Sequence, residues 1–252
     1  MLCLAPGAIL GVLIGIVLAV VGLPVEAVAA LVLVTGLVAG WIWRVAPTMV
    51  LASLRATPST EDDDPRLHNL VDGLCASMGL ERPAIYVVQS DVPNTLALGR
   101  DQGSATLVVT SGLDRSLDLV ELEGVLAHEL VHIKRNDTVL SAVAVAVALP
   151  WSVVRGTTAG ADTVHHLIGR GREFSADQRA ALIVRYPTGI GSALGAMVAG
   201  AAVPTGWPPA AGRVAALTRW LWIDPMAGDP TRAVAAGNLD DTRVRAAALE
   251  LS

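Results

Sequence analysis

The first part of the chain is an almost continuous hydrophobic stretch. Leu2–Leu23 and Ala27–Trp43 are two apolar runs, and Glu26 is the only ionisable residue before Arg44. The Gly-Leu-Pro sequence between the runs is typical of a turn. A membrane-spanning helix needs about 20 apolar residues. The pattern therefore predicts a transmembrane helical hairpin over residues 1–45, with the lipid bilayer as a partner.

The alternative for this region is a cleavable signal peptide. A signal peptide begins with a basic segment, and no Lys or Arg precedes Arg44. Arg44 and Arg55 follow the second apolar run, and positive charge gathers on the cytoplasmic side of membrane proteins. We therefore expect a multi-pass protein of the cell membrane, with its catalytic domain in the cytoplasm.

Beyond the hairpin the pattern becomes that of a folded domain. Residues 46–65 end in a polar, Pro-bounded acidic stretch and are predicted to be a linker, and residues 66–252 are predicted to form the domain. Apolar residues at helical spacing predict two helices, and short β-branched runs predict two strands. These elements are the helices Arg66–Met78 and Leu117–Arg135 and the strands Ala84–Gln89 and Thr106–Thr110. The fold class is α+β, mainly α, with a small β-sheet.

Composition excludes some functions. The chain is 53% hydrophobic and 16% charged, with a formal net charge of −5. An acidic protein has no basic field for phosphates, so nucleic acid is excluded as a partner. Its two cysteines, Cys3 and Cys75, do not make a disulfide framework.

The chemistry centres on His128-Glu129-Leu130-Val131-His132, an HExxH motif. Histidines four residues apart lie on one face of a helix, so both imidazoles reach one metal ion. The glutamate lies beside the metal's open position and acts as general base toward a zinc-activated water. The competing interpretation is an exposed polar helix face, because the motif also occurs by chance.

A second pair of residues favours the zinc site. A catalytic zinc takes a third protein ligand, and Glu173 and Asp177 are four residues apart on a predicted helix. Glu173 completes a His/His/Glu site for one Zn²⁺ per chain. Asp177 accepts the remaining ring N–H of a ligand histidine and fixes its tautomer. Without the HExxH motif, this pair would read as a solvated helix face.

These stretches resemble the HtpX-like and CAAX-prenyl-protease-type membrane zinc metallopeptidases. Three segments carry the resemblance: AIYVVQSDVPNTLALG, TLVVTSGL followed by ELEGVLAHELVHIKRND, and EFSAD. The resemblance implies a zincin-like domain. It also implies that Asn94 and Ala97 bind substrate on an edge strand that pairs with an extended peptide. The alternative for Asn94 is an ordinary turn residue.

The chain departs from the family's pattern near its end. A His-Pro-Pro-x-x-x-Arg-type segment is replaced by Gly237–Leu249, where Arg243 takes the arginine position and the His-Pro is missing. Arg243 is the candidate that stabilises the oxyanion, followed by Arg179 and the pair His165–His166. A surface salt bridge is the alternative for Arg243.

The zinc site restricts the membrane topology. His128 and Glu173 must lie on the same side of the membrane, so an even number of spans separates them. Val139–Val154 is the one convincing apolar segment between them, and we interpret it as a helix buried against the catalytic helix or dipping into the membrane. Ile190–Val203 is expected to be a packed helix.

The sequence thus predicts a membrane-bound zinc metalloendopeptidase that acts on membrane or membrane-proximal proteins. Two other classes stay open: a regulatory protein that makes a single signalling cut, and a non-catalytic zinc-binding scaffold. Prenylated peptides are not inferred as substrates, because nothing in the sequence indicates a prenyl-binding chamber.

Overall fold

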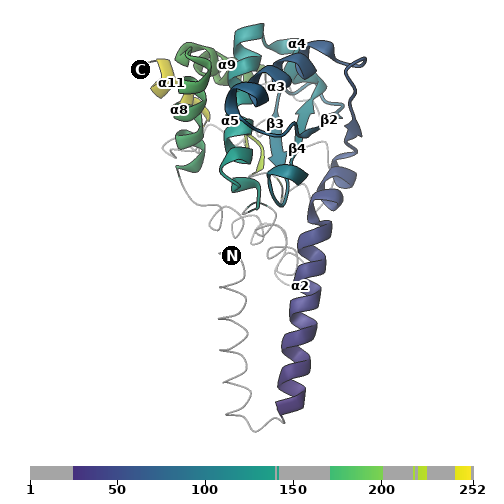
Figure 1. Ribbon diagram of the computed structural model, residues 1–252. Helices are drawn as coiled ribbons and strands as arrows, with labels where there is room; N and C mark the ends of the chain where they lie inside the picture. Colours follow the sequence, from purple (N-terminus) through teal and green to yellow (C-terminus); the bar gives the residue numbers. More distant parts are fainter. Residues whose placement is uncertain are drawn as a thin grey trace. The chain divides into compact units, whose positions relative to one another are not determined.

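The computed structural model describes residues 25–139, 141, 171–200, 218, 221–225 and 242–250. The chain divides into two compact units, residues 1–45 and residues 46–252. The second unit contains the residues singled out by the sequence, on a small sheet and the helices around it (Figure 1).

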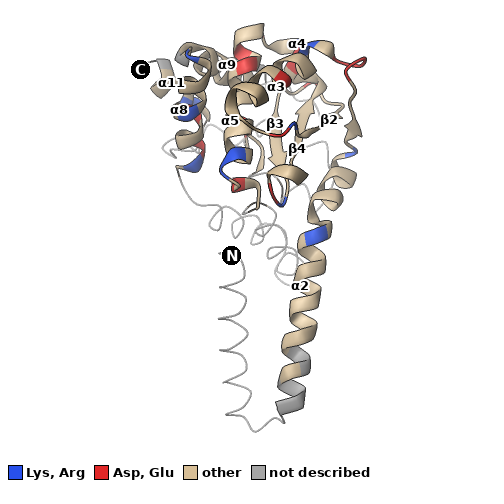
Figure 2. Cartoon of the chain, viewed as in Figure 1, with Lys and Arg blue, Asp and Glu red and all other residues tan. Residues whose placement is uncertain are grey.

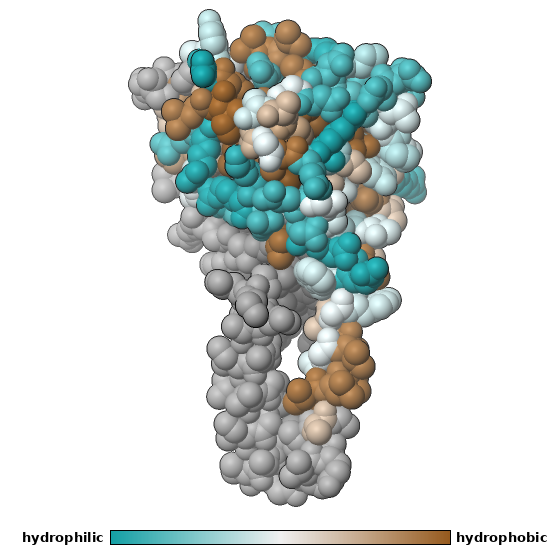
Figure 3. Space-filling view, viewed as in Figure 1, coloured by the Kyte–Doolittle hydropathy of each residue, from teal (hydrophilic) through white to brown (hydrophobic). Residues whose placement is uncertain are grey.

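A long apolar helix, α2 (Val25–Leu54), leads into the second unit. Its stretch Val32–Ser53 is long and apolar enough to cross a membrane, and only 6% of that window is buried. No charged residue lies between Ala27 and Trp43 (Figure 2). Hydrophobic side chains cover the exposed part of α2 (Figure 3). The large exposed ones are Val32, Leu33, Val34, Leu37, Val38, Trp41, Trp43 and Met49.

The structure shows one such helix among the described residues. The other predicted arm of the hairpin, Leu2–Leu23, lies outside the described residues, so the hairpin stays a prediction. The same holds for Val139–Val154, of which only residues 139 and 141 are described.

Residues 46–65 are not the free linker that the polar composition predicts. The helix α2 continues to Leu54, and Val50 and Leu54 are buried. Strand β1 (Thr57–Pro58) then pairs antiparallel with β2. Only the acidic turn before α3 matches the expectation. Burial of the apolar side chains every fourth residue in the last turns of α2 is what keeps this segment helical.

Four short strands form one mixed sheet in the order β1-β2-β4-β3. Strands β2 (Ala84–Val88) and β4 (Thr106–Thr110) confirm the two predicted strands and pair in parallel. Strand β3 (Thr95–Leu98) pairs antiparallel with β4 and lies at the edge of the sheet.

Both faces of this sheet are covered, as the alternation of its apolar residues requires. Leu107 and Val109 of β4 point into the main core. Val108, between them, packs with Val50 and Leu54 of α2 on the other face. The nearly unbroken apolar run of β4 follows from this burial on both sides.

The helices of the main core surround α5 (Leu119–Lys134), which carries the HExxH motif. It contacts α3 (Pro65–Met78), α8 (Arg172–Val184), α9 (Pro187–Gly200) and the edge strand β3. Helix α11 (Thr242–Glu250) packs mainly on α9. The short helix α4 (Ser111–Ser116) precedes α5.

Two local features fix the position of α5. At its start, Asp118 and Glu121 form a capping box, each side chain accepting the other's backbone N–H. Along its length, Gly124 faces α9 so closely that a Cβ there would lie 2.9 Å from the backbone nitrogen of Ile190. The glycine therefore allows α9 to approach the catalytic helix, and Ile190 is fully buried there, as expected for a packed helix.

Candidate metal centre and active site

Three metal-ligand side chains from two helices meet in the interior. His128 and His132 lie one turn apart on α5, and Glu173 comes from the first turn of α8. The Nε2 atoms of the two histidines are 3.1 Å apart. The Glu173 carboxylate lies 3.2 Å from Nε2 of His128 and 3.5 Å from Nε2 of His132.

This triangle fits a tetrahedral zinc ion. Zinc binds His nitrogen and carboxylate oxygen at about 2.0–2.2 Å, which places neighbouring tetrahedral ligands about 3.3 Å apart. The three separations are close to that value, with His128 facing Oε2 of Glu173 and His132 facing Oε1. One ligand atom from each residue lies within 4.8 Å of the others. Two imidazole nitrogens facing each other in a buried space is an arrangement that a shared cation stabilises. The donor set is also the one that zinc prefers.

Glu129 lies beside the triangle and is 2% exposed. It lines a small pocket together with His132, Glu173 and residues from other elements. The pocket has a volume of about 10 Å³, which is the space of a single water molecule. Burial raises the pKa of Glu129, partly offset by the neighbouring histidines. A buried carboxylate next to the space for one water is the arrangement of a general base.

Asp177 stands behind His128, as expected from its position one turn after Glu173. Its Oδ1 atom lies 2.8 Å from Nδ1 of His128, although the N–H direction is outside good hydrogen-bond geometry. Burial opposes the charge of His128, but Asp177 and Glu173 outweigh it and raise its pKa to about 9. In the neutral imidazole, a carboxylate beside Nδ1 favours the tautomer that carries its proton there, which leaves the Nε2 lone pair for a metal.

His132 has an orienting carboxylate of its own, which the sequence analysis did not identify. Its Nδ1 atom lies 3.1 Å from Oδ2 of Asp137. Asp137 follows the end of α5, where Asn136 adopts the left-handed conformation (φ 57°) and turns the chain. Asn is one of the few residues that adopts this conformation readily. The Asn-Asp pair just after HExxH was the available signal.

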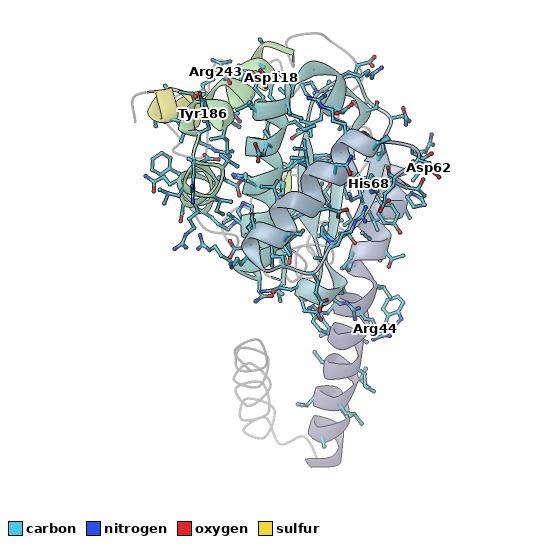
Figure 4. All side chains as sticks on the ribbon, turned by 45° about the horizontal axis from the view of Figure 1, so that its top comes forward. Arg44, Asp62, His68, Asp118, Tyr186 and Arg243 are labelled. Carbon is cyan, nitrogen blue, oxygen red and sulfur yellow. The ribbon has the colours of Figure 1, made fainter. Side chains whose placement is uncertain are left out.

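Of the two arginines of α11, Arg245 reaches the site and Arg243 does not. Arg245 is fully buried and forms a bidentate pair with Asp177, with Nε and Nη2 each 2.7 Å from a carboxylate oxygen. Arg243 is exposed at the periphery of the domain (Figure 4). Residues two apart on a helix are rotated by about 200°, so only one of these arginines faces the core.

Asn94 is fully buried, and its side chain bonds to the protein itself. Its amide donates to the carbonyl of Asp224 at 2.9 Å and accepts from the backbone N–H of Asp224 at 3.1 Å. The N–H of Thr95 donates to the same Asn94 oxygen, and the Thr95 carbonyl accepts from the N–H of Ile223. The N–H and C=O of Thr95, which point away from β4, are thus already hydrogen-bonded to Asn94 and to Ile223.

Ala97 is the next residue of β3 whose backbone N–H and C=O point away from β4. Backbone groups of an antiparallel strand point alternately toward and away from the neighbouring strand. Asn94 pairs with β4 and Thr95 with Ile223, so the N–H and C=O of Ala97 point away from β4. Ala97 also lines the pocket beside Glu129. The structure therefore places Ala97 at the pocket beside Glu129, whereas the Asn94 side chain bonds to the backbone of Asp224.

Sequence comparison assigns the chain that carries this site to a known family. The sequence profile described as Peptidase family M48 matches residues 61–221. The chain belongs to this family. It is 36% identical over 166 residues to "Protease HtpX homolog" of Dictyoglomus thermophilum, which covers 54% of each chain. It is 34% identical over 184 residues to a protein of the same name from Acidiphilium cryptum, covering 62% of this chain and 63% of the relative.

A third relative matches over most of its length. "Protease HtpX homolog" of Gemmatimonas aurantiaca is 31% identical over 248 residues, covering 83% of this chain and 88% of the relative. The match to the Dictyoglomus thermophilum protein, by contrast, spans only about half the length of that relative. The matched residues 61–221 include all three metal-ligand side chains, Glu129 and Asp177, whereas Arg245 lies beyond them.

Proposed function

We propose that the chain is a zinc metalloendopeptidase that hydrolyses peptide bonds of membrane or membrane-proximal proteins. The triangle of His128, His132 and Glu173, with Glu129 at the adjoining one-water pocket, carries the proposal. Membership of a peptidase family and the protease names of the relatives support it. The exposed apolar stretch of α2 supports attachment to a membrane. We further propose that the chain is multi-pass with its catalytic domain in the cytoplasm.

The chemistry follows from the residues at the site. Zinc held by His128, His132 and Glu173 would polarise the peptide carbonyl and lower the pKa of a water. Glu129 accepts a proton from that water as its oxygen bonds to the carbonyl carbon and the π electron pair moves to the carbonyl oxygen. Glu129 then gives the proton to the amide nitrogen as the C–N bond breaks. The electron pair on the oxygen re-forms the C=O bond as the amine leaves, and the proton of the new carboxylic acid passes to the amine, so the products are a carboxylate and an ammonium group.

Removal of zinc tests this function. The purified chain in detergent is expected to contain one zinc per chain and to cleave casein into several fragments. 1,10-Phenanthroline should abolish cleavage, and stoichiometric zinc should restore it. Metal analysis and gel-based cleavage assays measure both. A non-catalytic zinc-binding scaffold would leave casein intact although it contains zinc, and a signalling protease would contain zinc but cut one target once; either result contradicts the proposal.

Substrate binding is proposed to use the edge strand β3 at Ala97, a residue that is 6% exposed. An extended peptide adds to a sheet edge through main-chain hydrogen bonds, and Ala97 presents its N–H and C=O there, beside Glu129. Asn94 contributes indirectly, because it holds Asp224 against the same strand.

The substitution Ala97→Pro is expected to raise KM for casein-derived peptides about tenfold, with little change in melting temperature. Proline removes an N–H that takes no part in the β3–β4 ladder, which a sheet edge tolerates. Leu96→Pro is the matched control, since it removes an N–H that faces β4 and should unfold the edge strand. An unchanged KM in a folded Ala97→Pro protein would exclude pairing at this position.

A further inference from the structure

The geometry points to a second cation at the site. Arg172 is the first residue of α8, directly before the metal-ligand Glu173. Its side chain is 11% exposed, and it lines the same small pocket as Glu129, His132 and Glu173. A largely buried guanidinium therefore lines the same one-water space as Glu129.

The hydrogen bonds that Arg172 makes to the described residues use its two Nη atoms and not its Nε. Nη1 contacts the carbonyl of Asp137 and the hydroxyl of Ser141, both at 3.3 Å. Nη2 contacts the carboxylate of Glu173, also at 3.3 Å. The Nε atom is buried and has no hydrogen-bond partner. Buried donors are nearly always paired in folded proteins, and an exception calls for an explanation such as a catalytic role.

The other described arginines near the site have their Nε paired or lie at the surface. Arg245 has its Nε and Nη2 on Asp177 and its Nη1 on the carbonyl of Ile223 at 2.7 Å. Arg243 and Arg179 are exposed. His165–His166 lie outside the described residues. Among the candidates that the structure describes, Arg172 alone combines burial, a place at the pocket and an unused N–H.

We propose that the Nε–H of Arg172 donates a hydrogen bond to the carbonyl oxygen of the scissile peptide bond as that oxygen becomes an oxyanion. The inference rests on the proposed peptidase function. When the water oxygen bonds to the carbonyl carbon, the π electron pair moves to the carbonyl oxygen, and a preorganised cationic donor stabilises the charge there. The Nη atoms hold the guanidinium through Asp137, Ser141 and Glu173, so the side chain is positioned before substrate binds.

A purely structural role is the alternative. Arg172 also contacts Glu173, so its loss would affect the metal ligand. The two roles differ in what they stabilise. An oxyanion donor stabilises the transition state and hardly affects substrate in its ground state, whereas a residue that only positions Glu173 affects the metal.

The experiment compares Arg172→Met and Arg172→Lys with the wild type in detergent, and Arg115→Met serves as control because Arg115 is exposed and pairs with Asp91 at the surface. Four quantities are measured: zinc per chain, kcat, KM and the inhibition constant of a phosphinic peptide. The phosphinic peptide carries anionic oxygens in a tetrahedral arrangement, as the transition state does.

For Arg172→Met we expect kcat to fall about 10²–10³-fold, the range for loss of one oxyanion donor. KM should change less than threefold, one zinc should remain, and the phosphinic peptide should bind about 100-fold more weakly. Arg172→Lys should recover part of both losses, since it restores the charge without the planar donor. Arg115→Met should match the wild type.

Three results would contradict the role of Arg172 without contradicting the proposed peptidase function. The first is a fall in kcat with unchanged affinity for the phosphinic peptide, and the second is a loss of zinc that accounts for the lost activity. The third is wild-type kinetics in Arg172→Met. A wild-type chain without zinc and without cleavage would instead refute the proposed function, and this inference with it.

Discussion

The substitution Glu129→Gln is expected to lower kcat for casein-derived peptides by about 10²–10⁴-fold, the usual contribution of a general base, while zinc stays at one per chain. Gln has the shape of Glu but does not accept the proton of the attacking water. The proposed metal ligands are His128, His132 and Glu173, so the substitution removes none of them. Cleavage kinetics and metal analysis on the same preparation measure the two effects.

Two further substitutions on α5 make this test specific. His132→Ala removes a ligand and should lose zinc and cleavage together. Glu123→Gln makes the same chemical change at a half-buried position of the same helix, and it should keep wild-type activity. If Glu129→Gln retained turnover within tenfold of the wild type, the assignment of the general base would be wrong.

The second large effect is expected on stability, from Arg245→Met. Arg245 and Asp177 are both fully buried and form a bidentate pair. Burial raises the pKa of Asp177, but Arg245 and His128 outweigh it and hold that pKa below its ordinary value. Removing one partner of a buried ion pair leaves an uncompensated charge and costs about 3–5 kcal/mol of the free energy of unfolding. For a domain of this size the melting temperature should fall by roughly 10 °C.

Arg243→Met is the matched control, because it removes the same side chain two residues away on the exposed face of α11. Its effect should stay within about 0.5 kcal/mol. Thermal denaturation followed by circular dichroism, at pH 7 in the same detergent, measures both variants. Equal melting temperatures for the two would show that the buried pair does not hold α11 to α8.

The metal ligands could be identified from sequence because their positions follow from helix periodicity. A spacing of four residues places His128 with His132, and Glu173 with Asp177, on one face of a helix. Likewise, the alternation and β-branching of Ala84–Val88 and Thr106–Thr110 were sufficient to predict two strands. These patterns involve residues close together in the chain, so the geometry of a single helix or strand is enough to interpret them.

The supporting residues depend on contacts between segments far apart in the chain. Arg245 meets Asp177 across 68 residues, and Asn94 meets Asp224 across 130. The residue type and spacing of Arg243 and Arg245 are equally plausible in the sequence. Only the packing of α11 decides which of the two faces Asp177.

The sequence by itself thus determined the zinc chemistry, through HExxH and the downstream Glu173. It also determined the apolar character of the N-terminal segment, because hydrophobicity is a property of the residues alone. Tertiary structure decided which arginine supports the site, that Asn94 holds residues 223–224, and that Ala97 and Arg172 reach the pocket beside Glu129. Burial and the pairing of buried polar groups are collective properties, so they appear only once the helices and the sheet are packed.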